Sequence, residues 1–214
     1  PRRAPPPGPR FSRGNTMPAV AVPHGFTFVT PATDAADTRW PYRSGIHDDP
    51  PGRRLEALQF SHQPSPWIGD RSVLQLMPFD GRPTSSRTGR RRWITPGSER
   101  ARPHEYAADL GGGLRAEMTA TSHAAAFRVH GDGPEAVVGF VIDQPTDHGR
   151  LVWTDSEGFE GWMPEGTEDW GNAPRCYFAG IVLHPNGGAC GSRGALDDDG
   201  RGRVAGYVAG VGSL

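Results

Sequence analysis

Lysine is absent from the 214-residue chain, so all 23 of its basic residues are arginine. Only two cysteines occur, Cys176 and Cys190, too few for a disulfide scaffold or a CxxC metal site. No apolar run approaches the roughly 20 residues that a membrane helix needs. Because the formal net charge is −1, nothing favours nucleic acid or an anionic membrane. The sequence therefore predicts no nucleic-acid partner and no membrane partner.

Glycine and proline are abundant, with 30 and 22 residues, which favours a turn-rich β protein. The clearest strand is "LRAEMTAT", residues 114–121, where apolar and polar side chains alternate. "EAVVGFVID", residues 135–143, is a continuous apolar run, as expected for a central strand buried on both faces. No segment longer than two turns has helical periodicity. The predicted fold class is all-β, an antiparallel β-sandwich.

The domain boundaries follow from composition. Residues 1–13 begin with the proline-rich "PRRAPPPGPR" and are predicted to be a disordered or linker lead-in. Residues 14–214 are predicted to form one β-sandwich domain. Because the chain stops at Leu214 directly after an apparent strand, we expect this domain to be incomplete at its C-terminal end.

Motifs for enzyme chemistry are weak. Glycoside hydrolysis needs two carboxylates across the scissile bond, but spacing cannot pair the candidates in "EGFEGWMPEGTEDWG", residues 157–171, which is interpreted as an exposed loop. Its Trp162 could contact sugar or pack within the loop. The run Arg90–Arg92 is interpreted as a solvated loop rather than a phosphate site. No catalytic residue and no metal ligand are predicted from these motifs.

One tryptophan stands out because Trp67 lies between a proline pair, Pro64 and Pro66, and a Gly-Asp-Arg turn. Strand-like sequence flanks this loop on both sides. Its ring could fold back over the core or could form a platform for a ligand.

Three motifs, in this order, resemble the N-terminal domain of family 92 glycoside hydrolases. They are "GNTMPAVAVPHGFTFVTPAT", residues 14–33, "FSHQPSPWIGDRSVLQLMP", residues 60–78, and "LRAEMTATSHAAAFRVHG", residues 114–131. The resemblance covers roughly residues 14–182. It implies a calcium-dependent, inverting exo-α-mannosidase with a mannose-containing glycan as substrate, located outside the cell, in the periplasm or at the cell surface. A larger (α/α) barrel, the missing C-terminal catalytic domain, would supply the acid glutamate, the base aspartate and most calcium ligands.

By the same resemblance, the N-terminal domain contributes a loop to the sugar pocket. The candidate substrate-binding residues are therefore Trp67, His62, Gln63, Asp70 and Arg71. Many family members carry a Ser-x-Thr-His-x-Ser-Gly version of this loop, so the variant seen here leaves the preferred linkage open. Two other functions stay open: a carbohydrate-binding module without catalytic activity and a purely structural sandwich.

Overall fold

The computed structural model describes residues 18–35, 42, 53–61, 72–133, 136–143, 149–154, 157–164, 175–183, 192–196 and 205–211. Every regular element in these residues is a strand, so the all-β prediction is confirmed. None of the described residues forms a helix with the length and apolar character needed to cross a membrane. The strands are β1 (Phe28–Ala32), β2 (Arg54–Leu55), β3 (Ala57–Ser61), β4 (Ser72–Asp80), β5 (Arg92–Trp93), β6 (Arg100–Arg102), β7 (Glu105–Leu110), β8 (Leu114–Ala120), β9 (Ala125–His130), β10 (Val137–Asp143), β11 (Arg150–Trp153), β12 (Gly158–Pro164), β13 (Arg175–Ile181), β14 (Ser192–Leu196) and β15 (Ala205–Val211).

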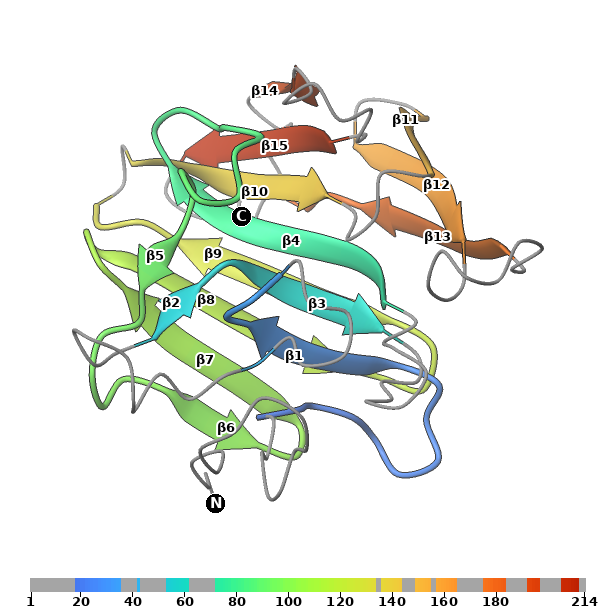
Figure 1. Ribbon diagram of the computed structural model, residues 1–214, viewed down its shortest axis with the longest axis horizontal. Coiled ribbons are helices and arrows are strands. Elements are labelled where there is room, and N and C mark those ends of the chain that lie inside the picture. Colours follow the sequence, from blue (N-terminus) through green and yellow to red (C-terminus); the bar gives the residue numbers. More distant parts are fainter. Residues whose placement is uncertain are drawn as a thin grey trace.

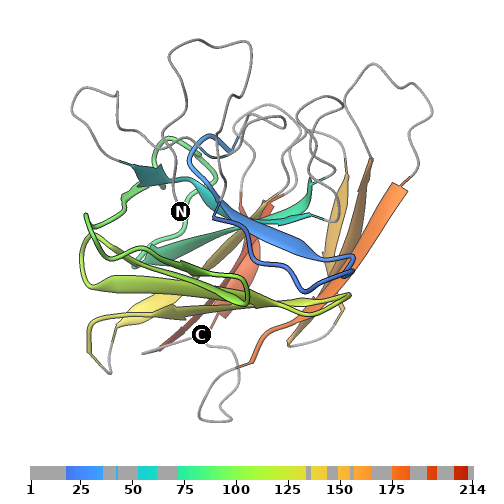
Figure 2. The same ribbon diagram turned by 90° about the horizontal axis from the view of Figure 1, so that it is seen from below.

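The strands form four antiparallel sheets (Figure 1). A six-stranded sheet has the order β1-β3-β4-β10-β15-β14, and a four-stranded sheet has the order β6-β7-β8-β9. A three-stranded sheet, β11-β12-β13, and a two-stranded pair, β2-β5, complete the set. The four-stranded sheet lies along one face of the six-stranded sheet (Figure 2). The three-stranded sheet lies at one end of the molecule, where the strands are coloured orange.

Strand alternation explains how the core forms. In β8, Leu114, Ala116 and Met118 are buried and the residues between them are more exposed, as the sequence predicted. Met118 joins one hydrophobic cluster with Leu58 and Leu76 of the six-stranded sheet. Side chains from the facing sheets therefore fill a single core, as in a β-sandwich.

The three-stranded sheet packs against the same large sheet. A Cβ atom added at Gly206 of β15 would lie 3.2 Å from side-chain atoms of both Leu151 and Trp153 of β11. Phe159 of β12 belongs to the main hydrophobic cluster. The inward faces of β11 and β12 thus extend the core.

The interpretation of residues 157–171 as a loop is wrong for its first half, because Gly158–Pro164 is strand β12. The structure uses Gly161 within this strand for close packing. A Cβ atom at Gly161 would lie 1.9 Å from the backbone oxygen of Arg150. Glycine is therefore required here by the approach of the neighbouring strand rather than by a turn.

Candidate functional site

A row of buried polar residues crosses the central strands of the six-stranded sheet. Thr30, Gln59, Gln75 and Asp143 are cross-strand neighbours on β1, β3, β4 and β10, and each is at most 1% exposed. The next row along the strands includes Leu58 paired with Leu76, on the opposite, core-facing side. We call the four polar residues the polar row. It lies on the sheet face turned away from the sandwich core.

The polar row lies close to the point where the chain leaves β3 and returns into β4. Ser61 ends β3 and pairs with Ser72, the first residue of β4, with a register shift between Phe60 and Ser61. Gln75 lies three positions further along β4. Such irregularities often re-aim a chain next to a functional site. The residues that join β3 to β4 therefore leave the sheet close to the polar row.

Two arginines from the β4–β5 connection close over this end of β10. Arg90 forms a buried ion pair with Asp143, and Arg87 approaches the same carboxylate at 3.5 Å. The Arg90 residue is only 4% exposed. Its neighbours in the run are also paired, since Arg91 Nε lies 2.5 Å from Glu56 and Arg92 contacts Asp80. The interpretation of Arg90–Arg92 as a solvated loop is therefore wrong for Arg90, which is buried, and for Arg92, which lies in β5, whereas Arg91 is exposed although it pairs with Glu56.

Amide side chains extend the polar row toward β1. The Gln75 Nε2 group donates to the Ala35 carbonyl at 2.8 Å and to Gln59 Oε1 at 3.3 Å. The Ala35 N–H in turn donates to Glu56 Oε2 at 2.8 Å. These bonds hold the segment after β1 against the outer face of β3 and β4.

Two atoms of this cluster lack a hydrogen-bond partner within the described part of the chain. They are Gln75 Oε1 and Arg90 Nε, both completely buried. A buried polar atom without a partner costs about 1–3 kcal/mol, so native proteins keep few of them. Counted over the described residues alone, these two atoms therefore have no partner at the end of the sheet from which the β3–β4 connection leaves.

A second buried ionic group joins the two-stranded pair to the four-stranded sheet. Glu99 accepts hydrogen bonds from Tyr106 at 2.9 Å and from Tyr42 at 3.4 Å, and it forms an ion pair with Arg53. Arg53 also donates to the Tyr42 hydroxyl at 2.9 Å. Burial, followed by the charge and hydrogen bond of Glu99, raises the pKa of Tyr106 well above its ordinary value of 10.0.

This raised pKa predicts a loss of stability at alkaline pH. The folded protein holds the Tyr106 proton more tightly than the unfolded chain does, so the contribution is complete below pH 10 and disappears as the pH rises toward the folded pKa. Above pH 10 we expect the free energy of unfolding to fall more steeply with pH for the unmodified protein than for Tyr106→Phe. The difference between the two slopes should be about 1.4 kcal/mol per pH unit. Urea unfolding between pH 9 and 11.5 measures both slopes. Parallel curves would contradict the assignment.

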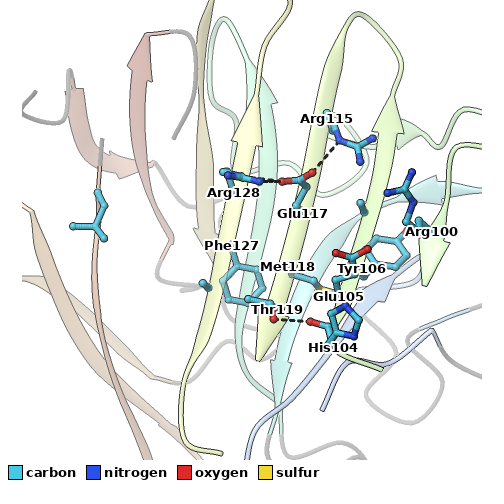
Figure 3. Close-up of a pocket in the computed structure, with 13 residues that line it drawn as sticks. Arg100, His104, Glu105, Tyr106, Arg115, Glu117, Met118, Thr119, Phe127 and Arg128 are labelled. Carbon is cyan, nitrogen blue, oxygen red and sulfur yellow. Dashed lines mark hydrogen bonds and ion pairs between the residues drawn. The ribbon is translucent and has the colours of Figure 1, made fainter. Parts of the chain in front are cut away.

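The outer face of the four-stranded sheet carries an open groove of about 590 Å³ (Figure 3). Charged side chains from neighbouring strands line it, and Leu183 is also among the lining residues. Glu117 accepts hydrogen bonds from Arg115 Nε at 3.0 Å and from Arg128 Nε at 2.8 Å. The groove is therefore braced by ion pairs that cross β8 and β9.

This bracing decides what Glu117 can do chemically. Partial burial alone would raise the pKa of its carboxyl group, but hydrogen bonds from Arg128 and Arg115 outweigh it, so the pKa lies below its ordinary value. A carboxyl group that stays ionised cannot donate a proton to a leaving group. Glu117 is therefore poorly suited to act as the acid of a glycosidase.

The family resemblance implies bound calcium, but the residues that the structure describes do not form a calcium site. No group of three or more acidic, histidine or cysteine side chains that could hold a metal occurs among them. Calcium takes six to eight oxygen ligands. Asp143, Glu56, Glu99 and Glu117 have their oxygens engaged by arginines instead.

Comparison with protein-family models now identifies the chain. Residues 8–187 match the model described as "Glycosyl hydrolase family 92 N-terminal domain". The chain belongs to this family. No curated protein matches it.

Solved structures of family 92 proteins share the fold. The family GH92 inverting mannosidase BT2199 from Bacteroides thetaiotaomicron VPI-5482 superposes with a TM-score of 0.75 at 24% identity, over 95% of this chain and 28% of that one. The gh92 family glycosyl hydrolase ccman5 superposes with a TM-score of 0.64 at 16% identity, over 92% of this chain and 29% of that one. The family 92 chain thus spans less than a third of each of these proteins.

All five sequence-predicted binding residues, Trp67, His62, Gln63, Asp70 and Arg71, lie outside the described residues. Their roles stay predictions. The structure describes only where β3 ends and β4 begins on either side of them. Sequence reasoning missed the polar row, although Gln75 within "VLQLMPF" and Asp143 after "VVGFVI" were polar residues in apolar strands, which is a usable signal.

Proposed function

We propose that this family 92 domain belongs to a glycosidase that releases mannose from α-mannosides, and that residues 62–71 form one side of its sugar pocket. Family membership is the observation that carries the proposal. The attachment of residues 62–71 beside the polar row supports it further, because pocket residues function best on a rigid base. The paired arginines, the glutamine amides and the Glu56 carboxylate supply that rigidity.

In this proposal Trp67 is the pocket aromatic. An indole ring offers a sugar an apolar face together with one N–H donor. Pro64 and Pro66 reduce the entropy that the loop loses when it is fixed around the sugar. His62, Gln63, Asp70 and Arg71 would supply hydrogen bonds to sugar hydroxyl groups.

The acid and base of the reaction would come from another part of a longer protein. The carboxylates of Asp143, Glu56, Glu99 and Glu117 are all paired with arginine, as described above, and therefore suit bracing rather than proton transfer. Calcium would also be bound in that other part. A location outside the cell, in the periplasm or at the cell surface fits a glycan substrate.

Trp67→Ala tests the proposal in the gene product that contains this chain. We expect kcat/KM for an α-mannoside to fall at least about tenfold, a loss of about 1.4 kcal/mol of transition-state stabilisation, with an unchanged thermal melt. Mannose release is measured beside the melting temperature, and the 214-residue chain alone is the control, expected to release no mannose.

The opposite pattern would overturn the assignment of Trp67. If the ring instead packs in the hydrophobic core, kcat/KM stays unchanged while the free energy of unfolding falls by about 3–5 kcal/mol, as for large aromatic truncations in cores. Mannose release by the 214-residue chain alone would instead contradict the assignment of catalysis to another part of the protein.

A further inference from the structure

The outward face of the three-stranded sheet exposes aromatic and apolar side chains. Along β13 the exposure alternates, with Tyr177 and Ile181 each 70% exposed while Phe178 and Gly180 between them are more covered. Leu183, just beyond the strand, is 68% exposed. Figure 2 shows this sheet as the orange strands at one end of the molecule. The face is regular strand, so its side chains have defined relative positions.

Two aromatic residues lie directly opposite each other on this face. Trp162 of β12 is the cross-strand partner of Tyr177 of β13. Directly opposed side chains on neighbouring strands have Cβ atoms about 5 Å apart, so Trp162 and Tyr177 are neighbours on the same face, and we call this pair the platform. The Arg175 guanidinium lies over the Trp162 ring, 4.0 Å from its centroid. Tyr177 carries no comparable contact among the described residues.

Charged side chains lie next to the platform, and two of them, Arg150 and Glu160, form no ion pair among the described residues. Arg150 is the cross-strand partner of Trp162 on β11, and Glu160 lies two residues before Trp162 on the same face. Neither forms an ion pair or side-chain hydrogen bond within the described residues. On the four-stranded sheet, by contrast, Arg128 is paired with Glu117 and Arg115 with Asp109. With respect to the described residues, Arg150 and Glu160 are therefore available for hydrogen bonds at the edges of the platform.

We propose that Trp162 and Tyr177 form a binding platform for a neutral polysaccharide, separate from the pocket assigned to residues 62–71. A pyranose ring has an apolar face of C–H groups that stacks on an aromatic ring, and a rim of hydroxyl groups. Arg150 and Arg175 would donate hydrogen bonds to those hydroxyl oxygens, and Glu160 would accept from the hydroxyl protons. The platform holds a glycan chain on the domain without performing chemistry.

The surrounding charges favour this ligand over two others. The core of a protein–protein interface is depleted of acidic residues but enriched in Arg, so among the flanking charges it is Glu160 that disfavours a protein partner. Nucleic acid is recognised through its phosphates, and Glu160 beside the rings would repel them. Sugar hydroxyl groups, which both donate and accept hydrogen bonds, use both signs of charge.

Affinity electrophoresis of the 214-residue chain tests the platform, in gels containing soluble α-mannan or hydroxyethylcellulose. We expect at least one polysaccharide to retard the unmodified chain, and Tyr177→Ala to weaken this binding at least about tenfold. Tyr177→Phe keeps the stacking ring and should retain most of the retardation. Phe26→Ala is the matched control, because Phe26 is also an exposed aromatic, 64% exposed, and lies in the segment before β1, away from this sheet.

Three results would overturn the proposal: no retardation in either gel, equal retardation of Tyr177→Ala and unmodified chain, or equal weakening by Phe26→Ala. Light scattering can give a fourth result that would overturn the proposal. In that result the unmodified chain is a dimer, Tyr177→Ala is a monomer, and neither polysaccharide binds. The face would then pair two copies. These measurements do not depend on mannosidase activity, so their failure leaves the role of residues 62–71 unaffected.

Discussion

Asp143→Asn should lower the free energy of unfolding by about 3–5 kcal/mol, the loss measured when one partner of a buried ion pair is removed. Asp143 is completely buried and contacts both Arg90 and Arg87. The amide has nearly the same shape, so packing is kept while the charge that both guanidinium groups contact disappears. Urea unfolding followed by tryptophan fluorescence at neutral pH measures the change.

Glu117→Gln is the matched control, because it makes the same carboxylate-to-amide change on an exposed sheet face. Glu117 is paired with Arg115 and Arg128, whose side chains are 33% and 59% exposed. Solvent screens such pairs, so we expect a loss below about 1 kcal/mol. Equal losses for the two variants would show that burial does not strengthen the Asp143 pairs.

Gly161→Ala should separate β11 from β12 and lower the free energy of unfolding by about 3 kcal/mol, the upper part of the range for overpacking. The added Cβ would lie 1.9 Å from the Arg150 backbone oxygen and 2.5 Å from the Phe178 ring. A ring can move, but a backbone oxygen held in a strand pair cannot move without disturbing the pairing. Thermal melting and the same urea titration report this loss.

Gly111→Ala provides the comparison. A Cβ atom at Gly111 would meet no atom within 4 Å, so the substitution adds a methyl group in open space. We expect a change within about 0.5 kcal/mol, as for surface substitutions away from special features. A Gly161→Ala protein as stable as Gly111→Ala would show that β11 and β12 can separate at little energetic cost.

Gly161 also bears on the polysaccharide platform, because it is the residue before Trp162 on β12. The close approach of β11 at this point brings Arg150 opposite Trp162. A variant that separates these strands would therefore weaken sugar binding through geometry, without removing any side chain of the platform. This is why Tyr177, an exposed side chain with no packing role on the inner face, is the cleaner probe.

The sequence alone determined the fold class and the strands with clear alternation. The pattern from Leu114 to Ala120 and the apolar run from Val137 to Asp143 became β8 and β10, because alternation marks a strand with one buried face and a short continuous apolar run marks a strand buried on both faces. The three family motifs were also readable without coordinates, and the family assignment is confirmed.

Tertiary structure alone decided which charges and rings meet. The Arg90–Asp143 pair joins residues 53 positions apart, and nothing local in an arginine run distinguishes a buried guanidinium from a solvated one. Strand β12 was hidden because Gly161 serves a close backbone approach that only the neighbouring strand reveals. The Trp162–Tyr177 pairing depends in the same way on the register of β12 and β13, which is set by packing across the sandwich rather than by either segment alone.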